Sequence, residues 1–238
     1  MKNLMIPALA LFLSAAAQAD DSPLWMRYCA ISPDGQTIAF SYQGDIYTVP
    51  SSGGKARQLT THPAHDTRPV WSPDGQRIAF ASNRSGNFDV FLMNKEGGEP
   101  KRLTTHSTNE YPTTFKDNGH ILYLANVLQD AKDIQFPGTR FMQVYEISTD
   151  GGRPDLYSSL YMENIALSKD GSKLLYNDYK GYEDPWRKHH QSSITRDIWL
   201  CTLGKDRSFQ KVTTFGGEDR NPVSVSYTHL RAHETSLH

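Results

Sequence analysis

Cationic and aromatic side chains cluster in one segment of the sequence, residues 182–196, where they could bind an acidic ligand. Guanidinium groups hold carboxylates through two parallel hydrogen bonds, so the segment can engage acidic groups, a peptide carboxylate or a further domain. A solvated loop in which Glu183 and Asp184 offset part of the charge explains the same composition, and the sequence leaves both interpretations open. The candidate binding residues in this segment are Trp186, Arg187, His189, His190 and Arg196.

Three further histidines, His62, His65 and His106, lie after or between strand-like segments and complete the set of candidate binding residues. Imidazole nitrogens are common zinc ligands, so a metal site is conceivable there. Histidines at the strand ends of neighbouring repeats need not converge on one ion, however. We therefore expect no metal site.

The sequence carries none of the common catalytic motifs. It contains no Gly-x-Ser-x-Gly elbow, no His-Glu-x-x-His pair, no phosphate-binding loop and no dinucleotide fingerprint. We therefore expect no catalytic residue and no cofactor within these 238 residues. The 25 basic and 26 acidic side chains leave a net charge of -1, which gives no broad positive field and disfavours nucleic-acid binding.

An internal repeat defines the elements that must position these residues. The motif Ser-Pro-Asp-Gly occurs at 32–35 and 72–75, and degenerate copies follow at 116–119 and 168–171. Each copy precedes two strands with alternating apolar and polar residues, and most copies continue with a Gly-rich turn and a third strand. Asp-Gly and Gly-Gly form turns because glycine tolerates positive φ. With the segment before each motif, every period holds four short strands, which is typical of a β-propeller blade.

We therefore expect an all-β protein, a β-propeller of about four four-stranded blades that form an incomplete, open propeller. The blades should span about 24–62, 63–106, 107–157 and 158–215, and a fifth should begin at 216–223. An open arc leaves an unpaired sheet flank at each end, which favours aggregation. Aromatic residues in phase with the strands should pack between blades rather than form a ligand cage, namely Trp71, Phe80, Phe91, Phe115, Tyr123, Tyr145, Tyr176 and Trp199.

The variable loops should collect on one face of the propeller. In a four-stranded antiparallel blade, the second connection and the link to the next blade lie on one face, and the first and third connections lie on the other. The second connections lengthen from 42–44 in the first blade to 127–142 and 178–196 in later blades. Long loops on a rigid scaffold usually carry binding sites, so we expect ligand binding on this face.

Both ends of the sequence differ from the repeat. Residues 1–19 are typical of a secretory signal peptide, because an apolar run at 4–17 precedes a small-x-small cleavage site. We therefore expect an exported protein, periplasmic or extracellular, with no membrane span after cleavage. Residues 224–238 resemble translated sequencing-adaptor sequence, so we expect an artefactual tail and a partial propeller, residues 20–223, cut from a longer protein.

The two cysteines, Cys29 and Cys201, fall at unlike positions of the repeat. A disulfide requires the two Cα atoms to lie within about 7 Å of each other. We therefore expect two unpaired thiols, both largely buried.

The repeat pattern Pro-x-Trp-Ser-Pro-Asp-Gly, Ile-Ala-Phe-x-Ser, Gly-Gly and Leu-Thr resembles the propeller repeat of TolB-type and tricorn-type proteins over about residues 24–223. Segments 24–28 and 185–199 more narrowly resemble exported tricorn-like serine peptidases. This resemblance implies a propeller that recognises or gates peptide or protein substrates for PDZ-like and protease domains further along a parent protein. Two alternatives stay open: a TolB-like periplasmic propeller that binds envelope proteins, and the propeller of a dipeptidyl-peptidase-type serine hydrolase.

Overall fold

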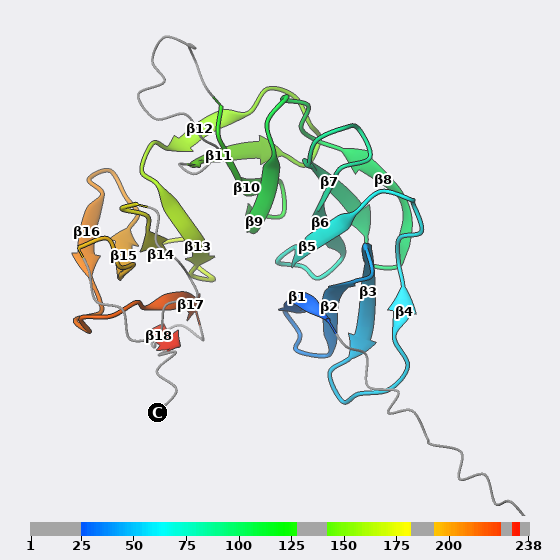
Figure 1. Ribbon diagram of the computed structural model, residues 1–238, viewed down its shortest axis with the longest axis horizontal. Helices are drawn as coiled ribbons and strands as arrows, with labels where there is room; N and C mark the ends of the chain where they lie inside the picture. Colours follow the sequence, from blue (N-terminus) through cyan, green and yellow to red (C-terminus); the bar gives the residue numbers. More distant parts are fainter. Residues whose placement is uncertain (1–24, 128–141, 182–192, 225–229, 234–238) are drawn as a thin grey trace, which may run out of the picture.

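The structure is a computed structural model that describes residues 25–127, 142–181, 193–224 and 230–233. All regular secondary structure in these residues is β-strand, in four four-stranded antiparallel sheets and one two-stranded sheet (Figure 1). The predictions of an all-β fold and of about four four-stranded blades in an open propeller are therefore confirmed. The described residues contain no helix with the length and apolarity that a membrane crossing requires.

Each four-stranded sheet is one blade, in which the strands follow in chain order from the inner to the outer edge. Blade 1 comprises β1 (Arg27–Ile31), β2 (Thr37–Tyr42), β3 (Asp45–Pro50) and β4 (Arg57–Gln58), and blade 2 comprises β5 (Asp66–Trp71), β6 (Arg77–Ser82), β7 (Asp89–Asn94) and β8 (Gly97–Arg102). Blade 3 comprises β9 (Glu110–Asp117), β10 (His120–Ala125), β11 (Gln143–Ser148) and β12 (Asp155–Ser158). Blade 4 comprises β13 (Met162–Leu167), β14 (Lys173–Asp178), β15 (Ile198–Thr202) and β16 (Ser208–Lys211), and β17 (Arg220–Ser224) pairs with β18 (Leu230–His233).

The Ser-x-Asp-Gly motif forms the same hydrogen-bonded turn in blades 1, 2 and 4. In blade 2 the Ser72 hydroxyl donates to Asp74 Oδ1 at 2.5 Å and accepts from the backbone N–H of Arg77 at 2.9 Å. Gly75 follows with φ 66°, a conformation that favours glycine. The hydrogen bond from the serine lowers the pKa of the aspartate in each turn, to about 2 for Asp170.

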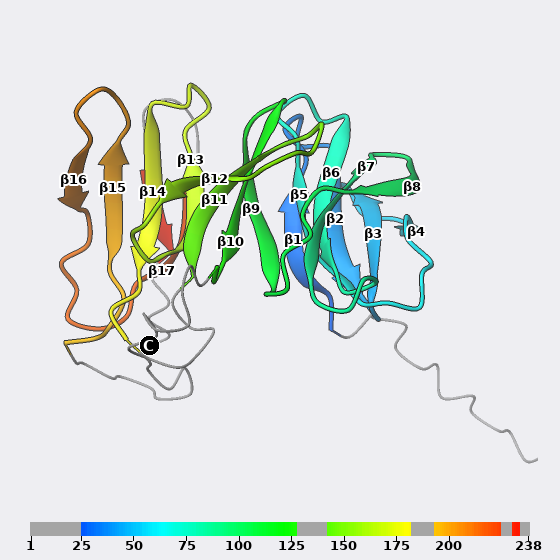
Figure 2. The same cartoon turned by 90° about the horizontal axis from the view of Figure 1, so that it is seen from above.

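The connections of the blades lie on two opposite faces. In Figure 2 the turns between β13 and β14 and between β15 and β16 lie at the same edge of blade 4. We call the face with these first and third connections the turn face. The second connections and the interblade links lie on the opposite face, which we call the link face.

The segment after the outer strand, Leu-Thr-Thr in blades 1 and 2 and Val-Thr-Thr in blade 4, is hydrogen-bonded back to its own blade. The hydroxyl oxygens of Thr60, Thr104 and Thr213 accept hydrogen bonds of 2.9–3.1 Å from backbone N–H groups at the start of the third strand. These donors are Ile46, Val90 and Ile198. The motif is therefore explained by a structural role in blades 1, 2 and 4.

Apolar contacts between neighbouring blades form the core. Each junction buries one cluster, and the second and third strands carry stacked aromatic pairs with centroids 5.7–6.0 Å apart, at Phe40–Tyr47, Phe80–Phe91 and Tyr123–Tyr145. The indole Nε1 of Trp71 also donates to the carbonyl of Ala30 across the first junction at 3.0 Å. The predicted interblade packing of the eight aromatic residues is confirmed, because all eight lie in or against these clusters.

The blades form an arc rather than a closed ring, and β1 lies at one end of it (Figure 1). Most of β1 is exposed, whereas β5, its equivalent in blade 2, is mostly buried between blades. The prediction that Cys29 is buried is therefore wrong. Cys29 is exposed, because no described blade packs against β1 on the side away from blade 2. Cys201 is buried, and the prediction that both thiols are unpaired is confirmed.

The other end of the arc carries the two-stranded sheet. Strand β17 lies beside the first two strands of blade 4, and β18 pairs with it in antiparallel register. Strand β18 falls within residues 224–238, which we expected to be an artefactual tail. These residues therefore provide a pairing partner for β17 in the structure.

Two acidic side chains are buried together between blades 2 and 3. Asp89 and Glu110 are at most 1% exposed, and Arg102 pairs with Asp89 at 2.8 Å. Burial raises the pKa of Glu110 to about 7, and the negative charge of Asp89 adds to this effect. Glu110 therefore retains its proton in the folded state at pH values where an exposed glutamate has lost it.

The free energy of unfolding should consequently depend on pH through Glu110. Between about pH 4.5 and 7 the unfolded chain releases this proton and the folded chain keeps it, so stability falls as the pH rises. Glu110→Gln removes this contribution. We expect the difference in stability between wild type and variant, from urea titrations, to change by up to about 1.4 kcal/mol per pH unit in this window. Parallel stability curves would show that Glu110 is not the titrating group.

Removal of the turn serine should destabilise the blade. Ser72→Ala leaves the backbone N–H of Arg77 without its acceptor, and we expect a loss of about 1–2 kcal/mol in the free energy of unfolding. Ser51→Ala, on an exposed turn, is the matched control and should change stability by less than about 0.5 kcal/mol. Equal effects in thermal or urea unfolding would contradict the role of the turn.

Candidate functional site

A cavity of about 440 Å³ lies where the inner strands of blades 2–4 and β17 converge. Small-molecule pockets have volumes of about 300–1,000 Å³, so the cavity can hold a small ligand or part of a larger one. The second connections and the link from blade 3 to blade 4 contribute to its wall, which places it at the link face. Its lining residues are Arg68, Tyr111, Leu124, Met142, Tyr161, Met162, Glu163, Asn164, Tyr179, Arg220 and Asn221.

The same position of each inner strand provides the residues at the centre. Tyr28, Arg68, Asn164 and Asn221 occupy it in β1, β5, β13 and β17, with φ values of 49–56°. The strand register shifts at each of these positions, which marks a bulge. Tyr111 occupies the corresponding position of β9, next to another register shift. A bulge re-aims side chains, and here it places one residue of each inner strand at the centre of the arc.

Arg68 lies between two tyrosine rings. Its guanidinium carbon is 4.2 Å from the ring centroid of Tyr111 and 5.1 Å from that of Tyr28. Burial raises the pKa of the Tyr111 hydroxyl, and the positive charge of Arg68 opposes this shift. Two ring faces thus hold the guanidinium plane in place, which is a cation-π arrangement.

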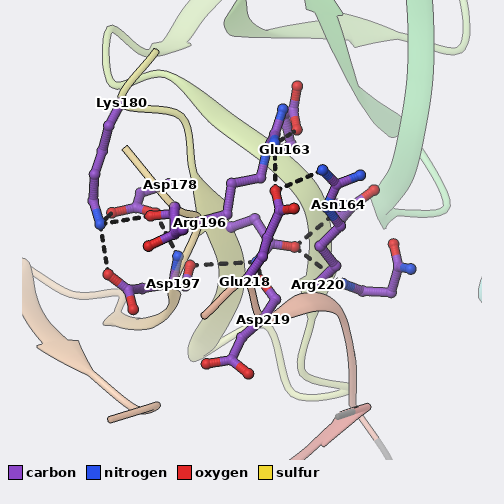
Figure 3. Close-up of polar contacts among 12 residues, drawn as sticks. Glu163, Asn164, Asp178, Lys180, Arg196, Asp197, Glu218, Asp219 and Arg220 are labelled. Atoms are coloured by element: carbon purple, nitrogen blue, oxygen red, sulfur yellow. Dashed lines mark hydrogen bonds and ion pairs between the residues drawn. The ribbon is translucent and has the colours of Figure 1, made fainter. Parts of the chain in front are cut away.

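One side of the cavity is fixed by an ionic network around Arg196 (Figure 3). Arg196 Nε lies 2.9 Å from Glu163 Oε2, and its Nη1 lies 2.6 Å from Glu218 Oε1. Arg220 reaches the same Glu218 oxygen at 2.6 Å. Burial acts to raise the pKa of Glu218, but hydrogen bonds from Arg220 and Arg196 outweigh it and hold that pKa below its usual range.

A second group of polar contacts lies within blade 4 and between blade 4 and β17 (Figure 3). Lys180 Nζ contacts Asp197 Oδ2 at 2.6 Å and Asp178 Oδ2 at 3.3 Å. The side chain of Asn177 donates to the carbonyl of Asp219 at 2.6 Å and accepts from the backbone N–H of Asn221 at 3.0 Å. These bonds position the cavity residues that β17 contributes.

The candidate residues of segment 182–196 are only partly within the described structure. Trp186, Arg187, His189 and His190 lie outside the described residues. Arg196 is buried, with its side chain 10% exposed, and its charge is matched by the two glutamates of the network. It therefore acts as a positioning residue beside the cavity, and its guanidinium also stacks on the ring of Tyr179 at 4.8 Å.

The three other candidate histidines stay apart from the cavity lining. His62 Nδ1 accepts from the backbone N–H of Ala64 at 3.0 Å, and His106 Nδ1 accepts from that of Thr108 at 3.2 Å. Exposed His65 meets the ring of Phe88 edge to face at 6.0 Å. Among the described residues no group of three or more His, Cys, Asp or Glu side chains is placed to hold a metal ion.

Sequence reasoning missed Arg68 and Tyr111, the central residues of the cavity. Both precede a proline in the segment before the repeated turn motif. An alignment of the blades would have shown that this position changes between Tyr, Arg and Asn, whereas the residue after it is proline in three of the five strands and Cys or Ile in the others. Such variation inside a regular repeat is the signal that could have indicated a functional position.

Comparison with known proteins decides the family. The model of the tricorn protease N-terminal beta propeller domain matches residues 23–229. The chain belongs to the tricorn N-terminal β-propeller family. Tricorn protease homolog 1 of Streptomyces coelicolor is 34% identical to it over 71 residues, which are 30% of this chain and 6% of that protein.

Two solved structures share the fold of this tricorn-family propeller. The crystal structure of the tricorn protease superposes with a TM-score of 0.66 at 19% identity, and it covers 89% of this chain and 22% of that chain. The putative TolB from Agrobacterium tumefaciens superposes with a TM-score of 0.64 at 18% identity, over 84% of this chain and 66% of that one. The matches span only 6–13% of the lengths of four curated relatives.

The network around Arg196 should contribute to stability. Arg196→Met leaves Glu163 and Glu218 with less compensation, and we expect a loss of about 2–4 kcal/mol in the free energy of unfolding. Arg57→Met, which breaks the exposed pair with Glu96, is the matched control and should cost less than about 0.5 kcal/mol. Urea titrations would contradict this assignment if both variants lost the same amount.

Proposed function

We propose that this propeller recognises or gates peptide substrates for the protease domain of an exported, tricorn-like serine peptidase. Membership of the tricorn N-terminal propeller family supports this role. The signal-like sequence at residues 1–19 supports export. The catalytic nucleophile would lie in another part of the parent protein, because the sequence described here carries no marked catalytic motif.

The central cavity is the observation that carries this proposal. Inner strands from successive blades supply its lining at equivalent positions, so the cavity depends on the assembly of the blades and not on one loop. Its lining combines the aromatic residues Tyr111 and Tyr179 and the apolar residues Leu124 and Met162 with charged groups. Such a mixture of apolar and polar groups suits part of a peptide chain.

A second candidate is a TolB-like propeller that binds envelope proteins. The TolB structure from Agrobacterium tumefaciens supports it, because the shared fold covers 66% of that chain. A TolB-like protein would bind a folded partner through an extended surface, whereas a peptidase propeller would bind short peptides in its central cavity. The two functions are therefore distinguished by the size of the ligand and by the residues that bind it.

Peptide binding can be measured by fluorescence anisotropy with the purified chain and a labelled pool of short peptides. We expect saturable binding that Tyr111→Ala weakens by about tenfold or more, because this change removes one wall of the cavity. Tyr42→Ala is the control, since the ring of Tyr42 also packs against an aromatic ring of another strand, that of Tyr47, but lies outside the cavity. Circular dichroism would check that both variants are folded.

Two results would contradict the proposal. One is the absence of saturable peptide binding while an envelope protein binds the chain, which would favour the TolB-like function. The other is peptide binding that Tyr111→Ala and Tyr42→Ala weaken equally. Hydrolysis of the peptides by the purified chain would contradict the placement of catalysis elsewhere, provided that a substitution within residues 25–223 abolishes it.

A further inference from the structure

Arg68 differs from the other partly buried arginines at and near the blade junctions. Arg84, Arg196 and Arg220 each contact a carboxylate at 2.6–2.9 Å, and the partly buried Arg77 donates to the backbone carbonyl of Asn118 in the next blade. Arg68 is partly buried as well, but among the described residues its side chain makes no hydrogen bond or ion pair, and its guanidinium lies over the rings of Tyr28 and Tyr111. Burial of a charge without a partner is costly, so a paired arrangement would be the ordinary one.

The comparison with Arg84 is direct because both arginines stack on two aromatic rings. Arg84 lies 4.7 Å from the centroid of Phe91 and 5.7 Å from that of Phe80, and it also binds Asp66 at 2.9 Å. The N–H donors of a guanidinium point outward in its plane, so contact with an aromatic ring leaves them free for an acceptor. For Arg84 a carboxylate takes these donors. Arg68 has no such carboxylate partner among the described residues, and it lines the cavity.

Among the charged residues that line the cavity, Arg68, Glu163 and Arg220, only Arg68 has no ion-pair partner in the described residues. Arg196 and Arg220 are engaged by Glu163 and Glu218, so Arg68 is the uncompensated cation of this group. A carboxylate carries one negative charge, whereas a phosphate monoester carries about 1.5–2 at neutral pH. A carboxylate also fits the two parallel N–H donors of a guanidinium edge. The site is therefore better matched to a carboxylate than to a phosphate.

Three apolar side chains line the cavity beside its polar groups and could pack against an apolar group attached to that carboxylate. Leu124 and Met162 are largely buried, and Met142 completes an apolar surface in the same cavity. We propose that the cavity binds a carboxylate carried on an apolar chain, with its two oxygens accepting hydrogen bonds from Arg68 between the rings of Tyr28 and Tyr111. This inference rests on the proposed function, in which the carboxylate belongs to a peptide, as an acidic side chain or as the chain end.

The test uses isothermal titration calorimetry with the full chain and three heptapeptides of one sequence. The first has blocked ends and a central glutamate, the second has blocked ends and a central glutamine, and the third has the glutamine and a free C-terminal carboxylate. 4-Phenylbutyrate, a small carboxylate with an apolar body, is the fourth probe. We expect the first or the third peptide to bind at least about tenfold more tightly than the second, and the preferred one identifies the source of the carboxylate.

Variants assign the effect to Arg68. Arg68→Met should remove the preference, so that within this variant the carboxylate peptide binds no more tightly than the blocked glutamine peptide, because the charged hydrogen bonds are lost. Arg68→Lys should retain part of the preference, since it keeps the charge but loses the planar donor pair. Arg57→Met, on the outer strand β4 and outside the cavity, should behave as wild type. Circular dichroism spectra would establish that each variant is folded.

The outcomes separate this inference from the proposed function. Equal binding of all three peptides, or a preference that persists in Arg68→Met, would overturn the carboxylate site and leave peptide recognition standing. Arg68-dependent binding of 4-phenylbutyrate without any peptide binding would support the carboxylate site and overturn the proposed function. Absence of binding by all four probes would overturn both.

Discussion

The structure depends on the packing of one blade against the next. A single four-stranded sheet of this size has two apolar faces, and burial of these faces between neighbours supplies most of the favourable free energy of such a fold. The stacked pairs Phe80–Phe91 and Tyr123–Tyr145 show the arrangement in consecutive blades, and the hydroxyl of Ser72 and its equivalents hold the turns that keep the strands in register. The exposure of β1 has the same cause, because the arc ends there.

The same packing creates the cavity. Inner strands converge because the blades are arranged radially, and a bulge at one repeated position turns Arg68 and its equivalents toward the centre. The ion pairs of Arg196 with Glu163 and Glu218 then fix the side of the cavity where blade 4 meets β17. The repeat thus provides a rigid frame, and residues that vary between blades at the bulge of the inner strand provide the polar groups of the cavity.

Much of the fold could be predicted from the sequence because its determinants are local. The repeated Asp-Gly turns and alternating strands indicate blades without knowledge of distant contacts. The centre of the site could not be predicted in this way. Arg68 becomes a candidate ligand-binding residue only when Tyr28 and Tyr111, from other blades, are placed on both sides of it. Arg196 looked like a free rim cation in the sequence, and its pairing with Glu218 depends on a contact between blade 4 and the link to β17.

Hydrogen–deuterium exchange, followed by mass spectrometry on the full chain, tests the radial packing of blades most directly. Protection from exchange follows burial and local stability. The exchange rates of equivalent inner strands should therefore differ only according to whether a neighbouring blade covers each strand. We expect the amides of β5 and β9 to exchange much more slowly than those of β1, with β6, β7 and β10 the slowest of all. Equal protection of β1 and β5 would contradict an open arc with a free first blade, and rapid exchange throughout β6 and β10 would contradict the packed blade junctions on which the cavity depends.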